Sequence, residues 1–125
     1  MGGDQVSIVV GVGCRANVPA EAFVALIAQA LAGRTATALA TPAFKADDAG
    51  LRKAAQALRL PVWPIDDAAL ARAQSGCVTR SPVAERETGF ASVAEAAALA
   101  ARPGATLLLP RITDGRVTVA LAEYP

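Results

Sequence analysis

Two glycine-containing segments carry the residues whose types and spacing are best suited to binding chemistry. The first, Gly11-Val-Gly-Cys-Arg15, directly follows the apolar run Val6 to Val12. We predict that it turns a strand into a helix, because glycine lets the backbone approach a ligand and the first amides of a helix are unpaired donors. The segment Gly89 to Glu95 is predicted to open a second helix in the same way. Together the two turns predict one anion-binding pocket; alternatively, the glycines only make tight turns.

Two cations are expected at the same edge of the predicted sheet. Arg15 and Lys45 fall just beyond the carboxyl ends of two neighbouring predicted strands. In open α/β sheets the ligand crevice lies outside the carboxyl ends of the strands. The shared edge favours a ligand-binding role for both, although each alone is typical of a solvated surface charge.

Cys14 and Glu95 are the candidate catalytic residues. At the start of a helix, the helix dipole and Arg15 would favour the Cys14 thiolate, but a buried cysteine that packs as a small apolar side chain is the preferred interpretation. Ser92 and Glu95 have the spacing of a capping box. A carboxylate bonded to the first amides of its own helix is a weak base, so Glu95 is a secondary candidate for a general base.

Several function classes are disfavoured by composition. The chain has no histidine, and Met1 is its only methionine, so the commonest general base and transition-metal ligand are missing. Gly11-Val-Gly13 lacks the third glycine of a dinucleotide fingerprint, and no Walker loop is present. A formal net charge of +1 does not support sequence-independent binding of nucleic acid. We therefore predict no metal site, no cofactor and no nucleic-acid partner.

The expected location is the cytoplasm. No apolar stretch approaches the roughly 20 residues of a membrane-spanning helix, and the N-terminus does not resemble a secretory signal. Cys14 and Cys77 lie in no C-x-x-C arrangement and are expected to be thiols, because a reducing compartment would keep them so. At 125 residues the chain fits one domain spanning residues 1–125, in which residues 1–4 are predicted to be disordered.

The first half of the chain is predicted to alternate strands and helices. Val6 to Val12 is expected to be a central strand, and Asn17 is expected to cap a helix that Gly33 ends. Further elements are a strand over 35–41, a helix opening at Asp47 and Asp48 and ending before Pro61, a strand over 62–65 that Pro64 moves toward the edge, and a short helix over 66–74.

The second half is predicted to end in a hairpin. No element is predicted over 76–89, whereas Ser92 to Ala101 is expected to be a helix whose small-residue face packs on the sheet. Two strands, 106–109 and 117–121, flank the turn Thr113 to Arg116. The fold class is therefore α/β: a single three-layer α/β/α domain with a mixed, mostly parallel sheet of about five strands and a C-terminal antiparallel hairpin.

Three stretches resemble the CobE family of cobalamin-biosynthesis proteins, which is similar to the C-terminal domain of the CbiG cobalt-precorrin hydrolases. They are Gly11-Val-Gly-Cys-Arg15, Ala40 to Lys45 with Asp47 to Leu51, and Thr88 to Leu99. The fused hydrolases typically read Gly-Thr-x-Ser-Val-Cys-Glu at the second turn, where this chain has Phe90 and Ala94. This departure favours the free-standing CobE branch of the aerobic pathway.

The resemblance implies that the ligand is a corrinoid or late precorrin such as hydrogenobyrinic acid, an apolar ring rimmed with carboxylates. The residues expected to bind it are Gly11, Gly13, Cys14, Arg15, Phe44, Lys45, Thr88, Gly89, Phe90, Ala91 and Ser92. Arg80, Val83 and Arg86 could add contacts from the loop. A carrier or accessory protein is the leading hypothesis. The alternatives are a precorrin hydrolase that opens the ring lactone or assists ring contraction or methylation, and a domain that docks other cobalamin-biosynthesis enzymes.

Overall fold

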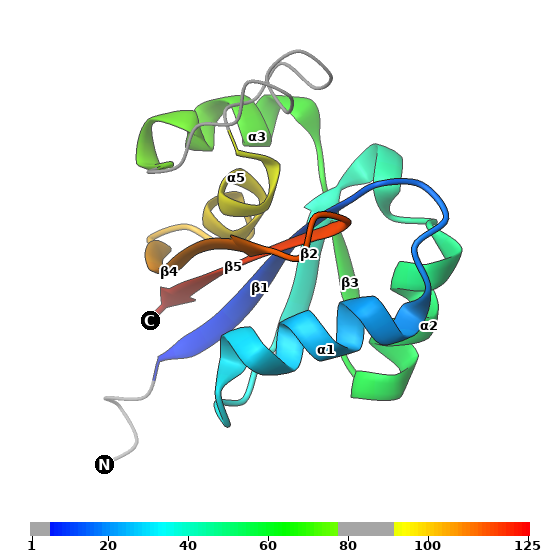
Figure 1. Ribbon diagram of the computed structural model, residues 1–125. Coiled ribbons are helices and arrows are strands. Elements are labelled where there is room, and N and C mark those ends of the chain that lie inside the picture. The colour runs from blue at the N-terminus through cyan, green and yellow to red at the C-terminus, as the bar shows by residue number, and fades with distance from the viewer. Residues whose placement is uncertain (1–5, 78–91) are drawn as a thin grey trace.

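The computed structural model describes residues 6–77 and 92–125. They form three layers, a central sheet with a layer of helices on each face (Figure 1). The expectations for residues 1–4 and for most of the loop before Ser92 lie outside the described residues. The elements in chain order are β1 (Ser7–Cys14), α1 (Ala20–Leu31), β2 (Ala38–Pro42), the short 3-10 helix η1 (Ala43–Lys45), α2 (Ala49–Leu58), β3 (Val62–Ile65), α3 (Asp67–Ala73), the 3-10 helix η2 (Gln74–Gly76), α5 (Val93–Ala100), β4 (Thr106–Thr113) and β5 (Val117–Tyr124).

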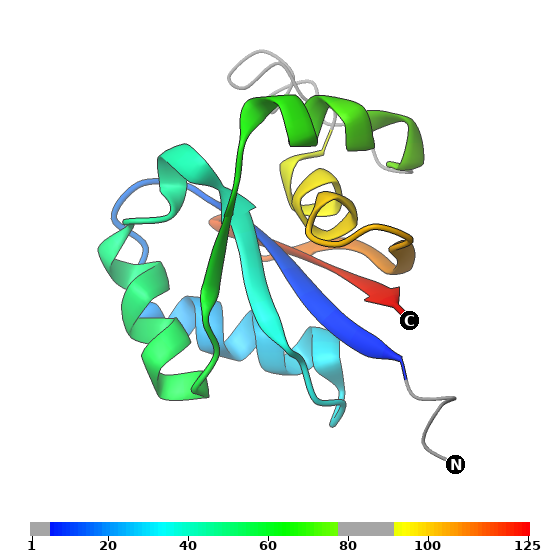
Figure 2. The same ribbon diagram turned by 180° about the vertical axis from the view of Figure 1, so that it is seen from behind.

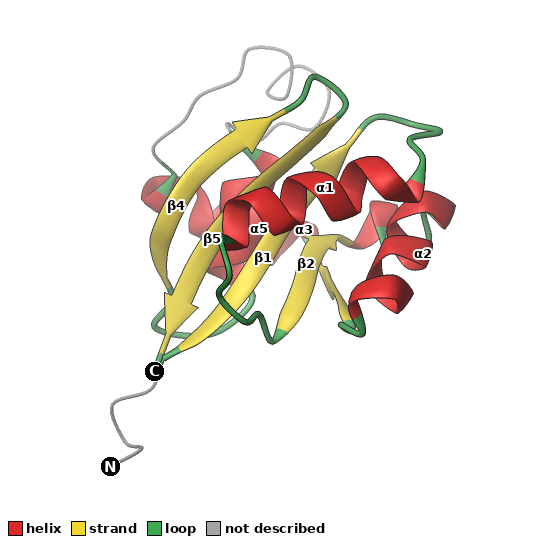
Figure 3. Ribbon diagram, turned by 60° about the horizontal axis from the view of Figure 1, so that its bottom comes forward, coloured by secondary structure: helices red, strands yellow, loops and turns green. Residues whose placement is uncertain are grey.

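The sheet confirms the predicted mixed topology. Its five strands lie in the order β3-β2-β1-β5-β4. Strand β2 pairs in parallel with β1 and β3, whereas β5 pairs antiparallel with β1 and β4 (Figure 3). Four of these five strands therefore run in the same direction. The expected C-terminal antiparallel hairpin is β4-β5.

Both outer strands of this sheet contain a proline. Pro64 lies in β3, which is an edge strand as predicted. Pro110 lies in β4, where the pairing with β5 shifts register between Leu109 and Ile112. Proline lacks the amide that a central strand must donate, so both positions fit the edges of a sheet.

Two hydrophobic cores lie on the two faces of the sheet. Helices α1 and α2 cover one face, and α3 and α5 cover the other (Figures 1 and 2). Alternate residues of β1 serve the two cores: Val10 and Val12 face α1 and α2, whereas Val9 faces α3 and α5. Phe23 of α1 is fully buried in the first core, which contributes about 1.5–3 kcal/mol relative to an exposed side chain.

Local sequence signals set most helix boundaries as predicted. The carboxylates of Asp48 and Asp66 accept hydrogen bonds from Leu51 N at 3.0 Å and Ala69 N at 2.7 Å, and so cap α2 and α3. Ser92 Oγ accepts from Glu95 N at 3.4 Å and caps α5.

The first helix is an exception, because the predicted cap at Asn17 is wrong. Helix α1 begins at Ala20 with Pro19 as the preceding residue, and Asn17 instead takes a left-handed conformation with φ of 63°. Asparagine is among the few residues that tolerate this conformation.

We predict that Gly50→Ala destabilises the protein, although alanine ordinarily favours a helix. An ideal Cβ on Gly50 would lie 2.1 Å from the carbonyl oxygen of Val18, so the first turn of α2 must move away from the segment that follows β1. The higher helix propensity of alanine contributes about 1 kcal/mol. Overpacking against the backbone outweighs this gain, so we expect the free energy of unfolding to fall by about 2 kcal/mol. Urea unfolding measures the change.

The matched control is Lys53→Ala, at an exposed position of the same helix. We expect this variant to stay within about 0.5 kcal/mol of the original protein. A Gly50→Ala variant that is as stable as Lys53→Ala would contradict the close contact between α2 and Val18.

Candidate functional site

The carboxyl ends of the parallel strands β1, β2 and β3 lie at one edge of the sheet, where the sequence predicts a ligand. The segment after β1, the η1 turn after β2 and the N-termini of α2 and α3 follow those strand ends. The hydroxyl of Thr41 in β2 is fully buried and donates a 2.8 Å hydrogen bond to the Val12 carbonyl oxygen of β1. This side-chain bond fixes the two strand ends from which the candidate residues emerge.

The predicted turn at Gly11 to Arg15 is wrong, because β1 continues through Cys14. Both Gly11 and Gly13 lie inside the strand. An ideal Cβ on Gly11 would lie 1.9 Å from the Ala94 carbonyl oxygen and 2.8 Å from the Ala98 Cβ, both in α5. The observed role of Gly11 is therefore to let α5 pack directly on the sheet, a second use of glycine that sequence alone cannot separate from a turn.

Cys14 does not have the properties expected of a nucleophile. It ends a strand rather than opening a helix, and its side chain is partly buried. Burial raises the pKa of the Cys14 thiol, the Asp48 carboxylate raises it further, and the Lys45 ammonium lowers it. The expectation that its surroundings favour the thiolate is wrong, because burial and Asp48 outweigh the cation. Cys14 fits the preferred interpretation of a packing residue.

Phe44 is exposed at this edge, and its neighbour Lys45 is partly exposed. Phe44 is 60% exposed and directly precedes Lys45 in the chain. The η1 turn that carries both is closed by hydrogen bonds from Ala46 N to Ala43 O and from Asp48 N to Lys45 O. The positive charge of Lys45 lowers the pKa of the Cys14 thiol at the end of β1, so the two groups interact electrostatically.

The β4-β5 turn is a neighbour of Arg15 that sequence analysis missed. The backbone N–H of Arg15 donates to the Arg116 carbonyl oxygen at 3.0 Å. The Asp114 carboxylate accepts from both Arg116 N and Val117 N at 2.8 Å, and these bonds hold the pKa of Asp114 below its ordinary value. The sequence predicts the hairpin but not its pairing with β1, which brings Arg116 to this edge.

Glu95 is fully buried in the first turn of α5. Its Oε2 accepts a 2.9 Å hydrogen bond from the backbone N–H of Arg111, at the register shift in β4. Burial and the Glu95 charge raise the pKa of the nearby Cys77 thiol to about 11. The carboxylate thus connects α5 to the edge strand, a structural use that the sequence did not predict.

The remaining site predictions fall mainly outside the described residues. Ser92 is described and buried, as the cap of α5. Thr88, Gly89, Phe90 and Ala91 are not described, nor are Arg80, Val83 and Arg86. Their ligand-binding roles stay predictions.

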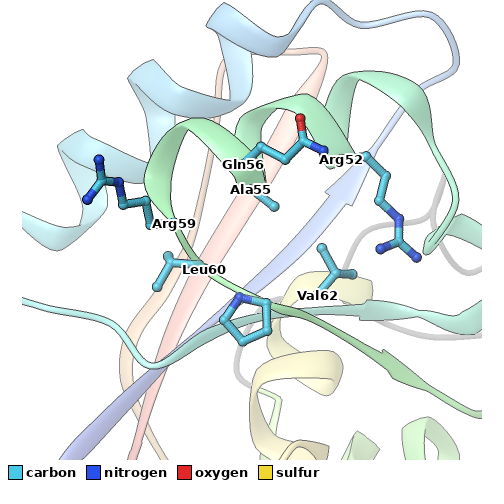
Figure 4. Close-up of a pocket in the computed structure, with 7 residues that line it drawn as sticks. Arg52, Ala55, Gln56, Arg59, Leu60 and Val62 are labelled. Carbon is cyan, nitrogen blue, oxygen red and sulfur yellow. The ribbon is translucent and has the colours of Figure 1, made fainter.

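A shallow depression lies away from this edge, between α2 and the start of β3. Its volume is about 200 Å³, and it is lined by Arg52, Ala55, Gln56, Arg59, Leu60, Pro61 and Val62. The two arginines lie at its opposite ends (Figure 4). Arg52 is paired with Asp47 at 3.2 Å in an exposed contact. The depression contains none of the residues predicted to bind a ligand.

Residues 6–77 and 92–125 contain no group of three or more His, Cys, Asp and Glu side chains that could hold a metal ion. In those same residues, no helix has the length and apolarity needed to cross a membrane.

Comparisons with known proteins agree with the resemblance found in the sequence. Residues 8–122 match the family described as Cobalamin synthesis G C-terminus. No curated protein sequence gives a significant match. The crystal structure of CobE, a protein from the cobalamin (vitamin B12) biosynthetic pathway, is 38% identical, with a TM-score of 0.89 over 97% of this chain and 92% of that chain.

Two further structures share the fold. Cobalamin biosynthesis protein chiG from Agrobacterium tumefaciens is 40% identical, with a TM-score of 0.73 over 92% of this chain and 96% of its own. A putative cobalamin biosynthesis protein G homolog from Sulfolobus solfataricus is 18% identical with a TM-score of 0.68, and this chain spans 38% of it. That last likeness concerns the fold alone. The chain belongs to the cobalamin synthesis G C-terminal family, together with CobE, and takes part in cobalamin biosynthesis.

Proposed function

We propose that this protein binds a corrinoid or late precorrin, such as hydrogenobyrinic acid, at the carboxyl edge of its sheet and acts as a carrier or accessory protein in the cytoplasm. Such a ligand is a broad apolar ring whose rim carries several carboxylates. It needs an apolar contact surface with cations around it.

The observation that carries the proposal is the exposed Phe44 ring next to Lys45, on a turn held by backbone hydrogen bonds. An aromatic ring that is 60% exposed leaves apolar area for a ligand to cover. Lys45 and Arg15 supply positive charge at the same edge, and charge-assisted hydrogen bonds to carboxylates are the strong ones.

The state of the two catalytic candidates supports binding over hydrolysis. Glu95 is fully buried and bonded to Arg111, and the Cys14 thiol is held in its neutral form by burial and Asp48. A nucleophile or base must reach the substrate, and a thiol attacks as the thiolate. The direct test is incubation of the protein with a lactone-bearing precursor. Turnover without a partner enzyme would overturn the carrier proposal in favour of a hydrolase.

We predict that Arg15→Ala and Lys45→Ala each weaken the binding of hydrogenobyrinic acid by about 1–3 kcal/mol, the range for hydrogen bonds to charged groups. The chain has a single tryptophan, Trp63, so quenching of its fluorescence by the absorbing ligand gives a titration signal. Added salt is expected to lower the affinity, because it screens exposed charges.

A suitable control is Arg34→Ala, which removes the same charge from an exposed position before β2, at the amino ends of the parallel strands. Its affinity is expected to equal that of the original protein. If Arg15→Ala and Lys45→Ala also bind with unchanged affinity, the ligand does not occupy this edge.

A further inference from the structure

Arg15 and Arg116 occupy opposite positions across the β1-β5 pair. The antiparallel register runs from Ser7 opposite Tyr124 to Cys14 opposite Val117. One further step places Arg15 opposite Arg116, and the 3.0 Å hydrogen bond from Arg15 N to Arg116 O follows this register. Residues directly opposite in an antiparallel pair project from the same face of the sheet.

Alternation along β1 relates the end of this strand to the face covered by α5. Val12 belongs to the core beneath α1 and α2, so Gly13, the next residue of β1, lies on the other face. Gly13, two residues before Arg15, confirms this direction, because its ideal Cβ would lie 3.6 Å from the Val93 side chain at the start of α5. The end of β1 therefore lies beside the first turn of α5, and the bond from Arg15 N to Arg116 O makes the two arginines neighbours there.

The energetics of this pair are unfavourable without an anion. Like charges directly opposite in an antiparallel pair destabilise it. Within the described residues, no carboxylate forms an ion pair with Arg15. Asp114 contacts Arg116 at a loose 3.7 Å, with side chains that are 30% and 55% exposed, and such surface pairs contribute little.

The turn that carries Arg116 is nevertheless well ordered by its own hydrogen bonds. One Asp114 oxygen accepts from Arg116 N and Val117 N, and the Thr113 hydroxyl donates to the Val117 carbonyl oxygen at 2.8 Å. The short hydrogen bonds of Asp114 therefore go to backbone N–H groups of the turn, whereas its contact with the Arg116 guanidinium is the longer one at 3.7 Å. A fixed backbone with two facing cations is arranged to receive a doubly anionic group.

We propose that Arg116 is a specificity-determining residue that, with Arg15, clamps adjacent carboxylates on the rim of the ligand. This inference rests on the proposed corrinoid-binding function and deepens it. The clamp selects rings whose neighbouring side chains are free acids over rings in which they are amidated, because an amide brings no negative charge to the two guanidinium groups.

The test is titration of Arg116→Gln, Arg15→Gln, the double variant and Arg34→Gln with hydrogenobyrinic acid and with a partly amidated form of the same ring. We expect Arg116→Gln to weaken binding of the acid about tenfold, as for Arg15→Gln. Arg34→Gln should bind as the original protein does. The original protein should prefer the acid, and the double variant should lose that preference.

Two failures are distinguishable. If Arg15→Gln weakens binding while Arg116→Gln binds as the original protein does, the assignment of Arg116 is overturned and the proposed function stands. If the original protein binds neither ring, the proposed function fails. Binding of carboxylates by Arg15 and Arg116 is then tested with citrate as the probe. Citrate should then raise the Tm of the original protein and of Arg34→Gln but not of the double variant. Equal shifts in all of them would overturn the clamp as well.

Discussion

Gly11→Ala should be strongly destabilising, with a loss of about 3 kcal/mol or more in the free energy of unfolding. The added methyl group would lie 1.9 Å from the Ala94 carbonyl oxygen, and neither the buried strand nor the helix above it can give way cheaply. Natural domains have about 5–15 kcal/mol of stability, so such a loss removes a large fraction of it. Chemical denaturation followed by circular dichroism measures the change.

Gly13→Ala is the matched control, because it makes the same chemical change two residues along the same strand. Its added methyl group would meet Val93 at 3.6 Å, an ordinary contact distance. We expect a change within about 1 kcal/mol, since alanine also restricts the unfolded chain. Equal stability of the two variants would show that α5 does not rest on Gly11. A large loss confined to Gly11→Ala would support close helix packing as the reason for this glycine.

Glu95→Ala should cost about 3 kcal/mol of stability, from a lost hydrogen bond to a charged acceptor and from the cavity left by a fully buried side chain. The Arg111 N–H would lose its 2.9 Å acceptor at the place where the ladder between β4 and β5 shifts register. Thermal unfolding measures the loss. Hydrogen exchange of the Arg111 amide reports on the bond itself and should become faster.

Glu95→Gln separates the shape of this side chain from its charge. Glutamine keeps an oxygen that can accept from Arg111, so we expect a smaller loss of about 1 kcal/mol, the difference between a charged and a neutral acceptor. If both variants match the original protein in stability and in Arg111 exchange, the carboxylate has no structural role. Glu95 would then return as a candidate base.

The sequence predicts those parts of the fold that depend on neighbouring residues. Asp48, Asp66 and Ser92 cap their helices through bonds to amides three residues away, so the pattern and the bond lie in the same short segment. The apolar stripe of α1, including Phe23 and Ile27, is buried as its helical spacing predicts.

The errors arise where a contact joins distant parts of the chain. Gly11 is consistent with either a turn or a close approach of another backbone, and only the placement of Ala94 and Ala98 over β1 decides between them. Arg116 reaches the candidate site because β5 pairs with β1, and no local pattern reports that pairing. The candidate site could thus be predicted at Lys45 and Arg15, which follow strands, but not at the hairpin.

The prolines in the two outer strands have a consequence for assembly. Pro64 in β3 and Pro110 in β4 each remove an amide from the free edge of the described sheet, and the register shift in β4 further interrupts its row of hydrogen-bonding groups. Exposed edges with a continuous row of such groups recruit other chains into intermolecular sheets. Both free edges of the described sheet are therefore poor templates for edge-to-edge aggregation, and another protein that docks on this domain would have to contact side chains rather than extend the sheet.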